Sequence, residues 1–166
     1  MRRLRSQYGS VLDFYEESGF IKLKTFHDKI EIGNIQMTAI PVGRDSRVAF
    51  VYVFEKSERR VVYAPCDIKP FPEHRDEVQN ADLLIIQPGI FVDGLKHGFK
   101  YPVGHISRTT LYTFKQTVEL AIRLQARKVV FVHLEEYWNR SYDDYHLLEA
   151  KNSNIHFAYD GMELQV

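Results

Sequence analysis

The sequence predicts an α/β domain in which helices pack on a mainly β half. The first 64 residues consist largely of short strand-like segments separated by turns, which is typical of an antiparallel meander. After Ala64, apolar strand-like runs alternate with segments of helical period, as expected of helices that pack on a sheet. A chain of 166 residues is one domain by size and is long enough to bury a sizeable core.

The composition describes an ordinary globular protein and argues against several functional classes. Hydrophobic residues make up 45% and charged residues 27% of the chain, with a formal net charge of zero. Nucleic-acid binding is possible but has no support from this charge balance. The single cysteine, Cys66, excludes an internal disulfide. No apolar segment follows the basic start and no stretch could span a membrane, so we expect a cytoplasmic protein with no membrane partner.

The first half is expected to contain one short helix and five strands. The helix is predicted at 11–15 and would end at Gly19. A reversal at 33–34 and a polar turn at 56–59 separate successive strands. The strands are predicted at 20–26, 29–32, 35–42, 48–55 and 60–64.

The second half is expected to alternate strands and helices. A weak helix is predicted at 73–80, and a long loop at 89–103 has the length of loops that are often functional. Ser107 or Thr109 could cap the next helix, whose apolar residues lie mainly on one side, and Ser141 would begin a helix at 142–151. Strands are predicted at 81–86, 128–133, 155–159 and 162–166.

Three polar residues stand where predicted strands end or a helix begins. His133 closes a buried apolar run, Asp67 follows the strand at 60–64, and His105 lies at the entry to a helix. A β-α-β arrangement would bring the two histidines to one edge of a sheet. Carboxylate and imidazole groups suit zinc, manganese or iron. Each residue alone could equally be structural, as a turn, a helix-entry residue or a polar group at a strand end.

Five segments, in this order, resemble the C-terminal half of the metallo-β-lactamase superfamily. The nearest branch is that of the tRNA 3′-processing endonucleases and the cyclic phosphodiesterases of phosphonate breakdown. The resemblance covers about residues 20–166 and implies an αββα sandwich, of which this chain, as the single domain 1–166, would be only the C-terminal half. The segments lie at 63–67, 81–86, 104–107, 130–134 and 158–164.

The resemblance also assigns roles to the three residues. Asp67 matches the aspartate that bridges two metals, and His133 matches the last histidine ligand. His105 matches the histidine that protonates the leaving group or steadies the phosphoryl oxygens. The implied activity is metal-dependent cleavage of a phosphodiester, in which two metals generate hydroxide from bound water while a histidine donates a proton.

The chain departs from the family pattern where most ligands would lie. It lacks the string His-x-His-x-Asp-His, and Arg44 or a neighbour stands where the family has a histidine. Arg44 could hold a phosphate, although a surface arginine is equally plausible. Two protein ligands are too few for a two-metal centre, since one catalytic zinc usually takes three. We therefore expect a hydrolase that is inactive or incomplete in this chain alone, with zinc as the first metal to test.

The missing N-terminal half leads us to expect a partner chain and leaves a second function open. A half-sandwich would leave apolar surface and strand edges uncovered, so we expect a homo-oligomer or pairing with a complementing chain. In the complementing case, the partner would supply the absent ligands. The alternative is a non-catalytic half-domain that acts as a binding or assembly module.

Overall fold

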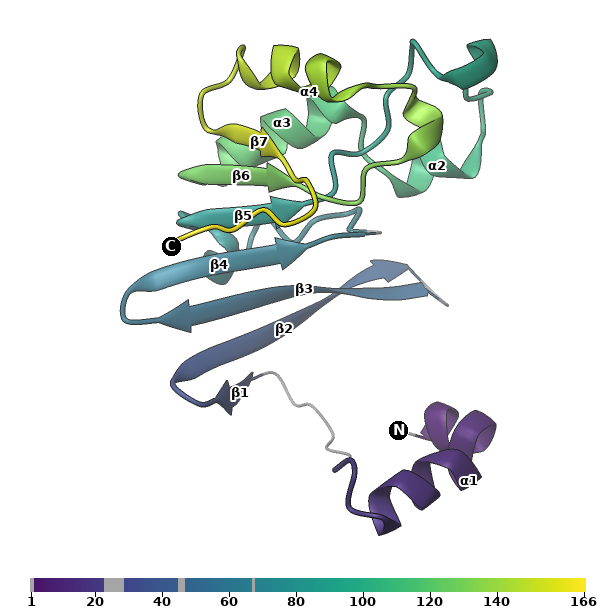
Figure 1. The fold of residues 1–166 in the computed structure, drawn as a ribbon, viewed down its shortest axis with the longest axis vertical. Coiled ribbons are helices and arrows are strands. Elements are labelled where there is room, and N and C mark those ends of the chain that lie inside the picture. Colours follow the sequence, from purple (N-terminus) through teal and green to yellow (C-terminus); the bar gives the residue numbers. More distant parts are fainter. Residues whose placement is uncertain (1, 23–28, 45–46, 67) are drawn as a thin grey trace.

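One mixed sheet organises the protein (Figure 1). The structure, a computed structural model, describes residues 2–22, 29–44, 47–66 and 68–166. Seven strands lie side by side in chain order, antiparallel from β1 to β4 and parallel from β4 to β7. The α/β prediction, with a meander followed by alternating elements, is therefore confirmed. The strands are β1 (Lys29–Ile32), β2 (Ile35–Arg44), β3 (Arg47–Lys56), β4 (Arg59–Ala64), β5 (Leu83–Ile86), β6 (Lys128–Phe131) and β7 (Ile155–Phe157).

Two tight turns set the register of the meander. Ile32 pairs with Ile35 across a two-residue loop in which Gly33 has a φ of +61°, a backbone conformation that glycine adopts without steric cost. Lys56 pairs with Arg59 across Ser57 and Glu58, whose φ values are +48° and +67°. Positive φ at both central residues is the geometry that matches the twist of the flanking strands.

The helices differ from the prediction in their boundaries. The helix predicted after 105 is two helices, because Leu111 is extended and Thr113 starts a new capping box with Gln116. His105 and Thr113 are the N-caps, so the prediction of Ser107 or Thr109 as cap was wrong. Ser141 does cap its helix. The helices are α1 (Arg2–Glu17), α2 (Ile106–Thr110), α3 (Phe114–Arg123) and α4 (Tyr142–Glu149).

Two further predictions were wrong, and a third lies mostly outside the described residues. The helix predicted at 73–80 is only a 3-10 turn, Asp76–Val78, within an irregular segment. Residues 162–166 extend without pairing to a strand, although Gly161 does form the expected turn with φ +82°. The strand predicted at 20–26 cannot be judged, since 23–28 are not described.

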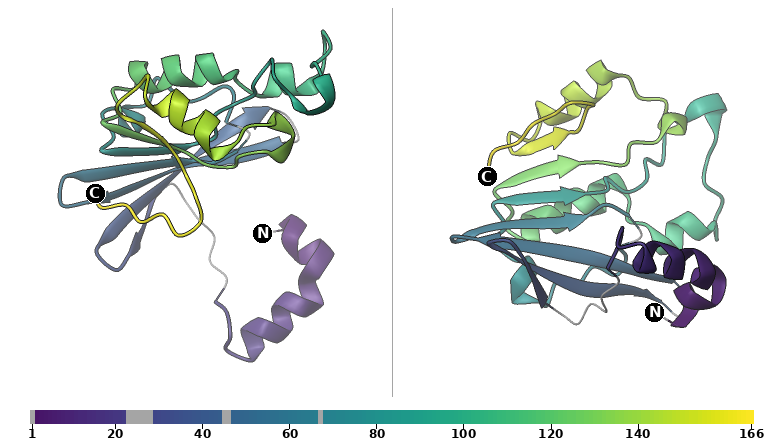
Figure 2. Two further views of the ribbon diagram at one scale, coloured as in Figure 1. Left: turned by 45° about the horizontal axis from the view of Figure 1, so that its top comes forward. Right: turned by 60° about the horizontal axis from the view of Figure 1, so that its bottom comes forward.

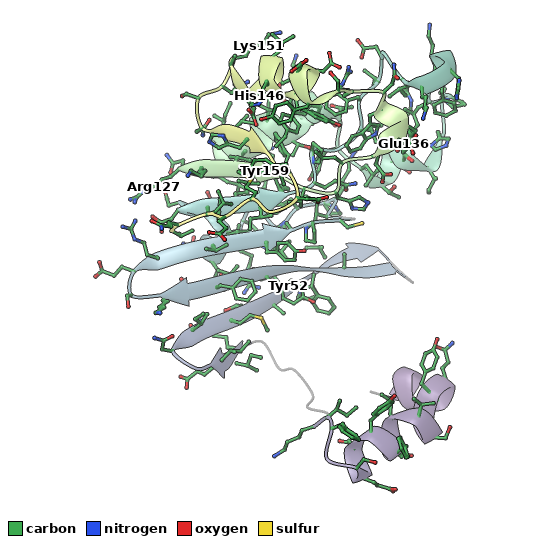
Figure 3. All side chains as sticks on the ribbon, in the orientation of Figure 1. Tyr52, Arg127, Glu136, His146, Lys151 and Tyr159 are labelled. Atoms are coloured by element: carbon green, nitrogen blue, oxygen red, sulfur yellow. The ribbon has the colours of Figure 1, made fainter. Side chains whose placement is uncertain are left out.

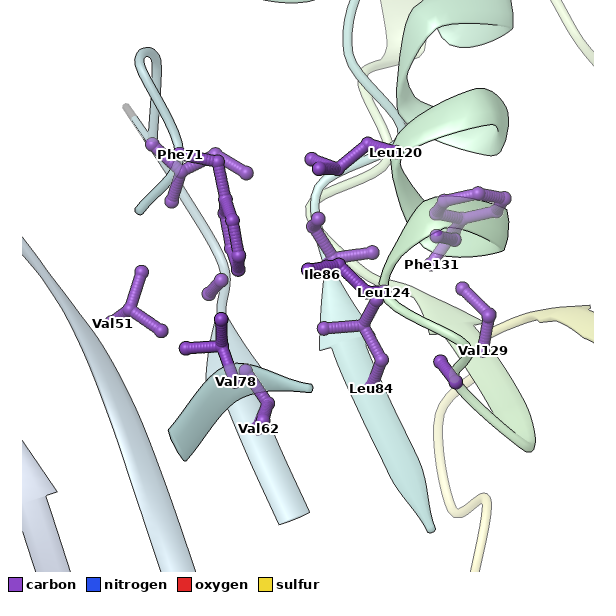
Figure 4. Packing of buried hydrophobic residues seen from close by; sticks show 14 of the residues in the cluster. Val51, Val62, Phe71, Val78, Leu84, Ile86, Leu120, Leu124, Val129 and Phe131 are labelled. Carbon is purple, nitrogen blue, oxygen red and sulfur yellow. The ribbon is translucent and has the colours of Figure 1, made fainter. Parts of the chain in front are cut away.

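One face of the sheet, called the covered face below, lies under α3 and the loops around it (Figures 2 and 4). Leu120 of α3 and Leu124, the C-cap of this helix, are buried in the core on this face. Phe114 stacks on Phe91 and packs edge-to-face on Phe131 in the same core. The strand residues of the covered face are at most 8% exposed. They are Ile40, Val42, Val51, Val53, Val62, Ala64, Leu84, Ile86, Val129 and Phe131.

The alternate residues of β2–β5 point to the opposite side, called the open face below. The segment 158–166 runs on this side, and α1 lies apart from the sheet (Figures 1 and 2). Among the residues that the structure describes, no helix is long and apolar enough to cross a membrane. The open face consists of Met37, Ala39, Pro41, Phe50, Tyr52, Phe54, Val61, Tyr63, Leu83 and Ile85, of which Ala39 and Leu83 are buried.

Candidate functional site

The carboxyl ends of three parallel strands meet at one rim of the sheet. Ala64, Ile86 and Phe131, the last residues of β4, β5 and β6, are aligned in register. The backbone N–H of Gln87 donates to the Ala64 carbonyl at 3.2 Å, and that of Val132 donates to the Ile86 carbonyl at 3.0 Å. The chain therefore leaves all three strands at the same edge, which is where α/β sheets place their binding sites.

His133 lies at this rim in a strained backbone conformation. Its φ is +61°, in the left-handed region of the backbone that few residues other than glycine and asparagine adopt. The imidazole is 41% exposed, and its Nε2 lies 3.0 Å from Oε1 of Glu135. A carboxylate that holds one ring nitrogen fixes the orientation of the imidazole and leaves the other nitrogen for another partner. Backbone strain of this kind tends to occur at functional positions.

A groove of about 440 Å³ beside His133 brings in a carboxylate that the sequence did not single out. Its walls come from the segments 132–134 and 158–160, joined where the Ala158 N–H donates to the Phe131 carbonyl at 2.8 Å. Asp160 lines this groove together with His133. From sequence, Asp160 was assigned only to a turn. The pairing of β6 with β7, which brings the segments 132–134 and 158–160 together, was not predicted from sequence.

His105 occupies a different environment, in an aromatic cluster at the start of α2. Its Nδ1 accepts a hydrogen bond from the Ser107 backbone N–H at 3.2 Å, so His105 is itself the N-cap of the helix. Its ring centroid lies 5.1 Å from that of Tyr101 and 6.3 Å from that of Phe99. Because Nδ1 accepts, a neutral His105 carries its proton on Nε2.

Tyr101 links this cluster to the segment that follows His133. It is 4% exposed, and its hydroxyl hydrogen-bonds the Tyr137 hydroxyl at 2.8 Å. Burial, followed by this hydrogen bond, raises the pKa of Tyr101, so it stays protonated over the whole range in which the protein would work. His105 is thus tied to the 136–138 turn through two tyrosines, whereas His133 lies in the groove with Asp160.

Two of the predicted site residues are not placed by the structure. Asp67 lies outside the described residues, although β4 ends three positions before it at Ala64. The backbone of Arg44 pairs with that of Arg47 at the tip of the β2–β3 hairpin, and its side chain is not described. The predicted convergence of Asp67, His105 and His133 therefore stays a prediction.

The described part of the chain does not contain a complete metal site. Across 2–22, 29–44, 47–66 and 68–166, no group of three or more histidine, cysteine, aspartate or glutamate side chains is arranged to hold a metal ion. His133, Glu135 and Asp160 are near one another around the groove without forming such a group. The described donors alone do not fit a catalytic metal, which requires three protein ligands.

The long loop predicted to be functional is anchored by packing at its start. Gly89 has a φ of +81°, and a Cβ there would lie 2.4 Å from the Tyr112 carbonyl oxygen, so only glycine fits. The Ile90 N–H donates to that same carbonyl at 2.8 Å. Arg140 then covers Phe91, with its guanidinium 4.3 Å from the ring centroid.

Comparisons with solved structures agree on the fold. A diphosphatase from the PhnP family superposes with a TM-score of 0.62 at 17% identity, over 93% of this chain and 52% of its own. Zn²⁺-bound PqqB from Methylobacterium extorquens gives 0.64 at 16% identity, over 95% and 62%. A possible metal-dependent hydrolase from Veillonella parvula gives 0.57 at 14%, over 95% and 64%.

These likenesses cover only part of the known structures. The chain spans between about half and two thirds of their length. No curated protein is similar enough in sequence to count as a match. The family described as the beta-lactamase superfamily domain, however, matches residues 7–134, which is most of the chain. Together with the mixed sheet and the rim at the ends of β4, β5 and β6, this match shows that the chain belongs to the β-lactamase superfamily and has a metallo-β-lactamase-like fold.

Proposed function

We propose that this chain is one part of a metal-dependent hydrolase that cleaves phosphodiesters and is inactive by itself. The observation that carries this proposal is the parallel rim, which presents His133 and Asp160 in one groove at the usual site of an α/β sheet. Relatives of this fold include a protein named a diphosphatase and one named a possible metal-dependent hydrolase. The sequence lacks the string His-x-His-x-Asp-His, and this is the reason for proposing that the chain is inactive by itself.

In this proposal Asp67 and His133 are metal ligands, and zinc is the first metal to consider. Glu135 supports the role of His133, because it already holds Nε2 at 3.0 Å and so orients the ring. The remaining ligands would come from another polypeptide segment or from a partner chain. In this proposal the residues of this chain bind and orient, and the additional ligands complete the metal site.

The two roles that the family resemblance allows for His105 are not equally compatible with its contacts. A general acid must carry protons on both ring nitrogens before it donates one, and protonation of Nδ1 would break the hydrogen bond with Ser107. The neutral ring can donate from Nε2 without any such loss. We therefore assign His105 to holding a phosphoryl oxygen, with Arg44 as a second phosphate contact.

Metal binding by the purified chain tests this proposal. We expect zinc to bind weakly in a chelator competition, with no hydrolysis of bis(p-nitrophenyl) phosphate by the chain alone. His133→Ala and Asp67→Ala should each weaken zinc binding about tenfold or more, the usual cost of losing a contact in such a site. His97→Ala, which removes an exposed loop histidine, serves as the matched control.

Three results would contradict the proposal. Two tightly held ions together with turnover would mean that the chain is a complete enzyme. Equal zinc binding in all four proteins would mean that the site is wrongly assigned. No zinc binding above that of a non-metal protein would instead favour the second candidate, a non-catalytic assembly module, for which the uncovered apolar face is the specific observation.

A further inference from the structure

Three aromatic rings form a ladder at the centre of the open face. The ring centroids of Phe50 and Tyr52 lie 6.0 Å apart, and those of Tyr52 and Tyr63 lie 6.5 Å apart, with interplanar angles of 30° and 31°. Tyr52 and Tyr63 are direct partners across β3 and β4. Phe50 is 39% and Tyr63 36% exposed. Figure 3 shows Tyr52 on the strands of this sheet.

None of the ten residues that define the open face is charged. All ten are apolar or aromatic, with tyrosine hydroxyls as the only side-chain polar groups. Lys56 and Arg59, on the same side, lie at the hairpin end where the face stops. In a pair related by a two-fold axis, each patch meets its own copy, so a charge near the axis would face a like charge. A neutral aromatic surface has no such penalty.

The size of the face is sufficient for a specific interface. Four strands spaced about 4.8 Å apart and roughly 25 Å long present about 500 Å² on each copy. Two copies would bury on the order of 1,000 Å², the lower limit for a specific protein interface. Patches of this size are also at the upper end of what monomeric proteins leave exposed.

The N-terminal helix is not the partner of this face. In α1, Phe14 packs edge-to-face on Tyr15 at 5.5 Å, and Tyr15 packs on Phe20 at 6.2 Å, so these rings form a cluster of their own. α1 also lies apart from the sheet in Figure 1 and in the left view of Figure 2. The C-terminal segment passes over β6 and β5 on this side (Figure 1), and its last residue, Val166, lines a groove with Ile35, Phe54 and Val61.

We propose that the open face is the interface of a homodimer, in which a second copy packs its own ladder against this one. Two sheets would then stack face to face about 10 Å apart, with α3 of each copy on the outside. The pairing would produce four layers from two identical chains. It rests on the geometry of the sheet and does not depend on the proposed hydrolase function.

Sedimentation velocity at protein concentrations from 1 to about 200 μM tests the dimer. We expect reversible dimerisation with a dissociation constant on the order of micromolar, as suits an interface near the lower size limit. Tyr52→Lys places a charge at the centre of the interface and should raise the dissociation constant at least tenfold. Phe14→Lys, which adds the same charge at an exposed aromatic of α1, should leave it unchanged.

Other sedimentation results would contradict the dimer. A wild-type chain that stays monomeric at every concentration, or a dimer that Tyr52→Lys does not weaken, would overturn the proposal. A dimer lost equally in Phe14→Lys would place the interface at α1 and overturn it as well. Circular dichroism checks folding, and Phe50→Lys repeats the test at a second position of the ladder. Zinc binding by the Tyr52→Lys monomer reports on the proposed function separately, because the rim lies outside the ladder.

Discussion

The two faces of the sheet have similar hydrophobicity but different residue types and different surroundings. The covered face consists almost entirely of aliphatic residues, several of which, such as Val51, Val53 and Leu84, are completely inaccessible to solvent. The open face carries the aromatic residues Phe50, Tyr52, Phe54 and Tyr63, of which Phe50 and Tyr63 are at least 36% exposed. Alternation along a strand therefore does not by itself distinguish a core face from an association face.

The difference in packing separates the face that supports folding from the face that is available for a partner. Close packing of branched aliphatic side chains against α3 excludes water and contributes to the stability of the single chain. Aromatic rings that remain partly hydrated contribute less to that stability, but they retain area that a partner can cover. Substitutions on the two faces should accordingly separate the free energy of unfolding from the affinity of association.

The largest effect is expected on the covered face. Leu120→Ala removes a fully buried side chain of α3 and should lower the free energy of unfolding by about 2–5 kcal/mol, the range for large-to-small core substitutions. Ile122→Ala, in the same helix but 67% exposed, should change it by less than about 0.5 kcal/mol. Urea unfolding at low protein concentration measures both. Equal effects of the two substitutions would show that α3 does not cover the sheet as described.

A smaller effect on the free energy of unfolding is expected from removing the N-terminal cap of α3, the helix that covers this face. Thr113 accepts from the Gln116 N–H at 3.3 Å, and the Gln116 side chain accepts from the Thr113 N–H at 2.9 Å. Thr113→Ala breaks this capping box and should cost about 1 kcal/mol in the same urea titration. Thr113→Ser keeps the hydroxyl and is the matched control. A loss in the serine variant as large as in the alanine variant would point to the methyl group, and not to the cap.

Sequence alone predicted the fold well where local signals were sufficient. The hairpin at Gly33 and the apolar run before His133 were both found, because turn chemistry and strand patterns act over a few residues. The break between α2 and α3 was missed, since a helical stripe runs across it while the extended Leu111 interrupts the backbone. The final strand at 162–166 was over-predicted, because apolar alternation there serves packing on the open side rather than pairing.

The candidate site was harder to predict, because it depends on contacts between distant segments. Sequence placed His133 at a strand end correctly, but it could not show that Glu135 holds the ring or that Asp160 shares its groove. Both follow from the path of the chain after β6 and β7. The approach of His105 to His133 stays a prediction, and neither the cap that His105 forms with Ser107 nor its contact with Tyr101 was expected from sequence.

The smallest effect on the free energy of unfolding is expected at Asp82, which lies at the end of the sheet opposite the rim. Its side chain contributes to the packing of neither face. Its carboxylate accepts from the Arg60 N–H at 2.8 Å and pairs with Arg59 at 3.0 Å and Arg127 at 2.9 Å. The Arg60 backbone hydrogen bond, then the two guanidinium groups, lower the pKa of Asp82 below its ordinary value of 3.8. Because the folded pKa is the lower one, the stabilisation is complete above pH 4 and is lost as the pH falls further.

Asp82→Asn should therefore cost about 1 kcal/mol or less at pH 7, as is usual for pairs with exposed arginines, and the difference from the wild type should shrink towards pH 3. Urea unfolding at pH 7, 5 and 3 measures this trend, with the exposed Asp93→Asn as control. The cost should add to that of Leu120→Ala and should not vary with protein concentration, because Asp82 contacts neither α3 nor the ladder. A cost that grew with concentration would place this end of the sheet inside the dimer interface and would move the interface away from the aromatic ladder.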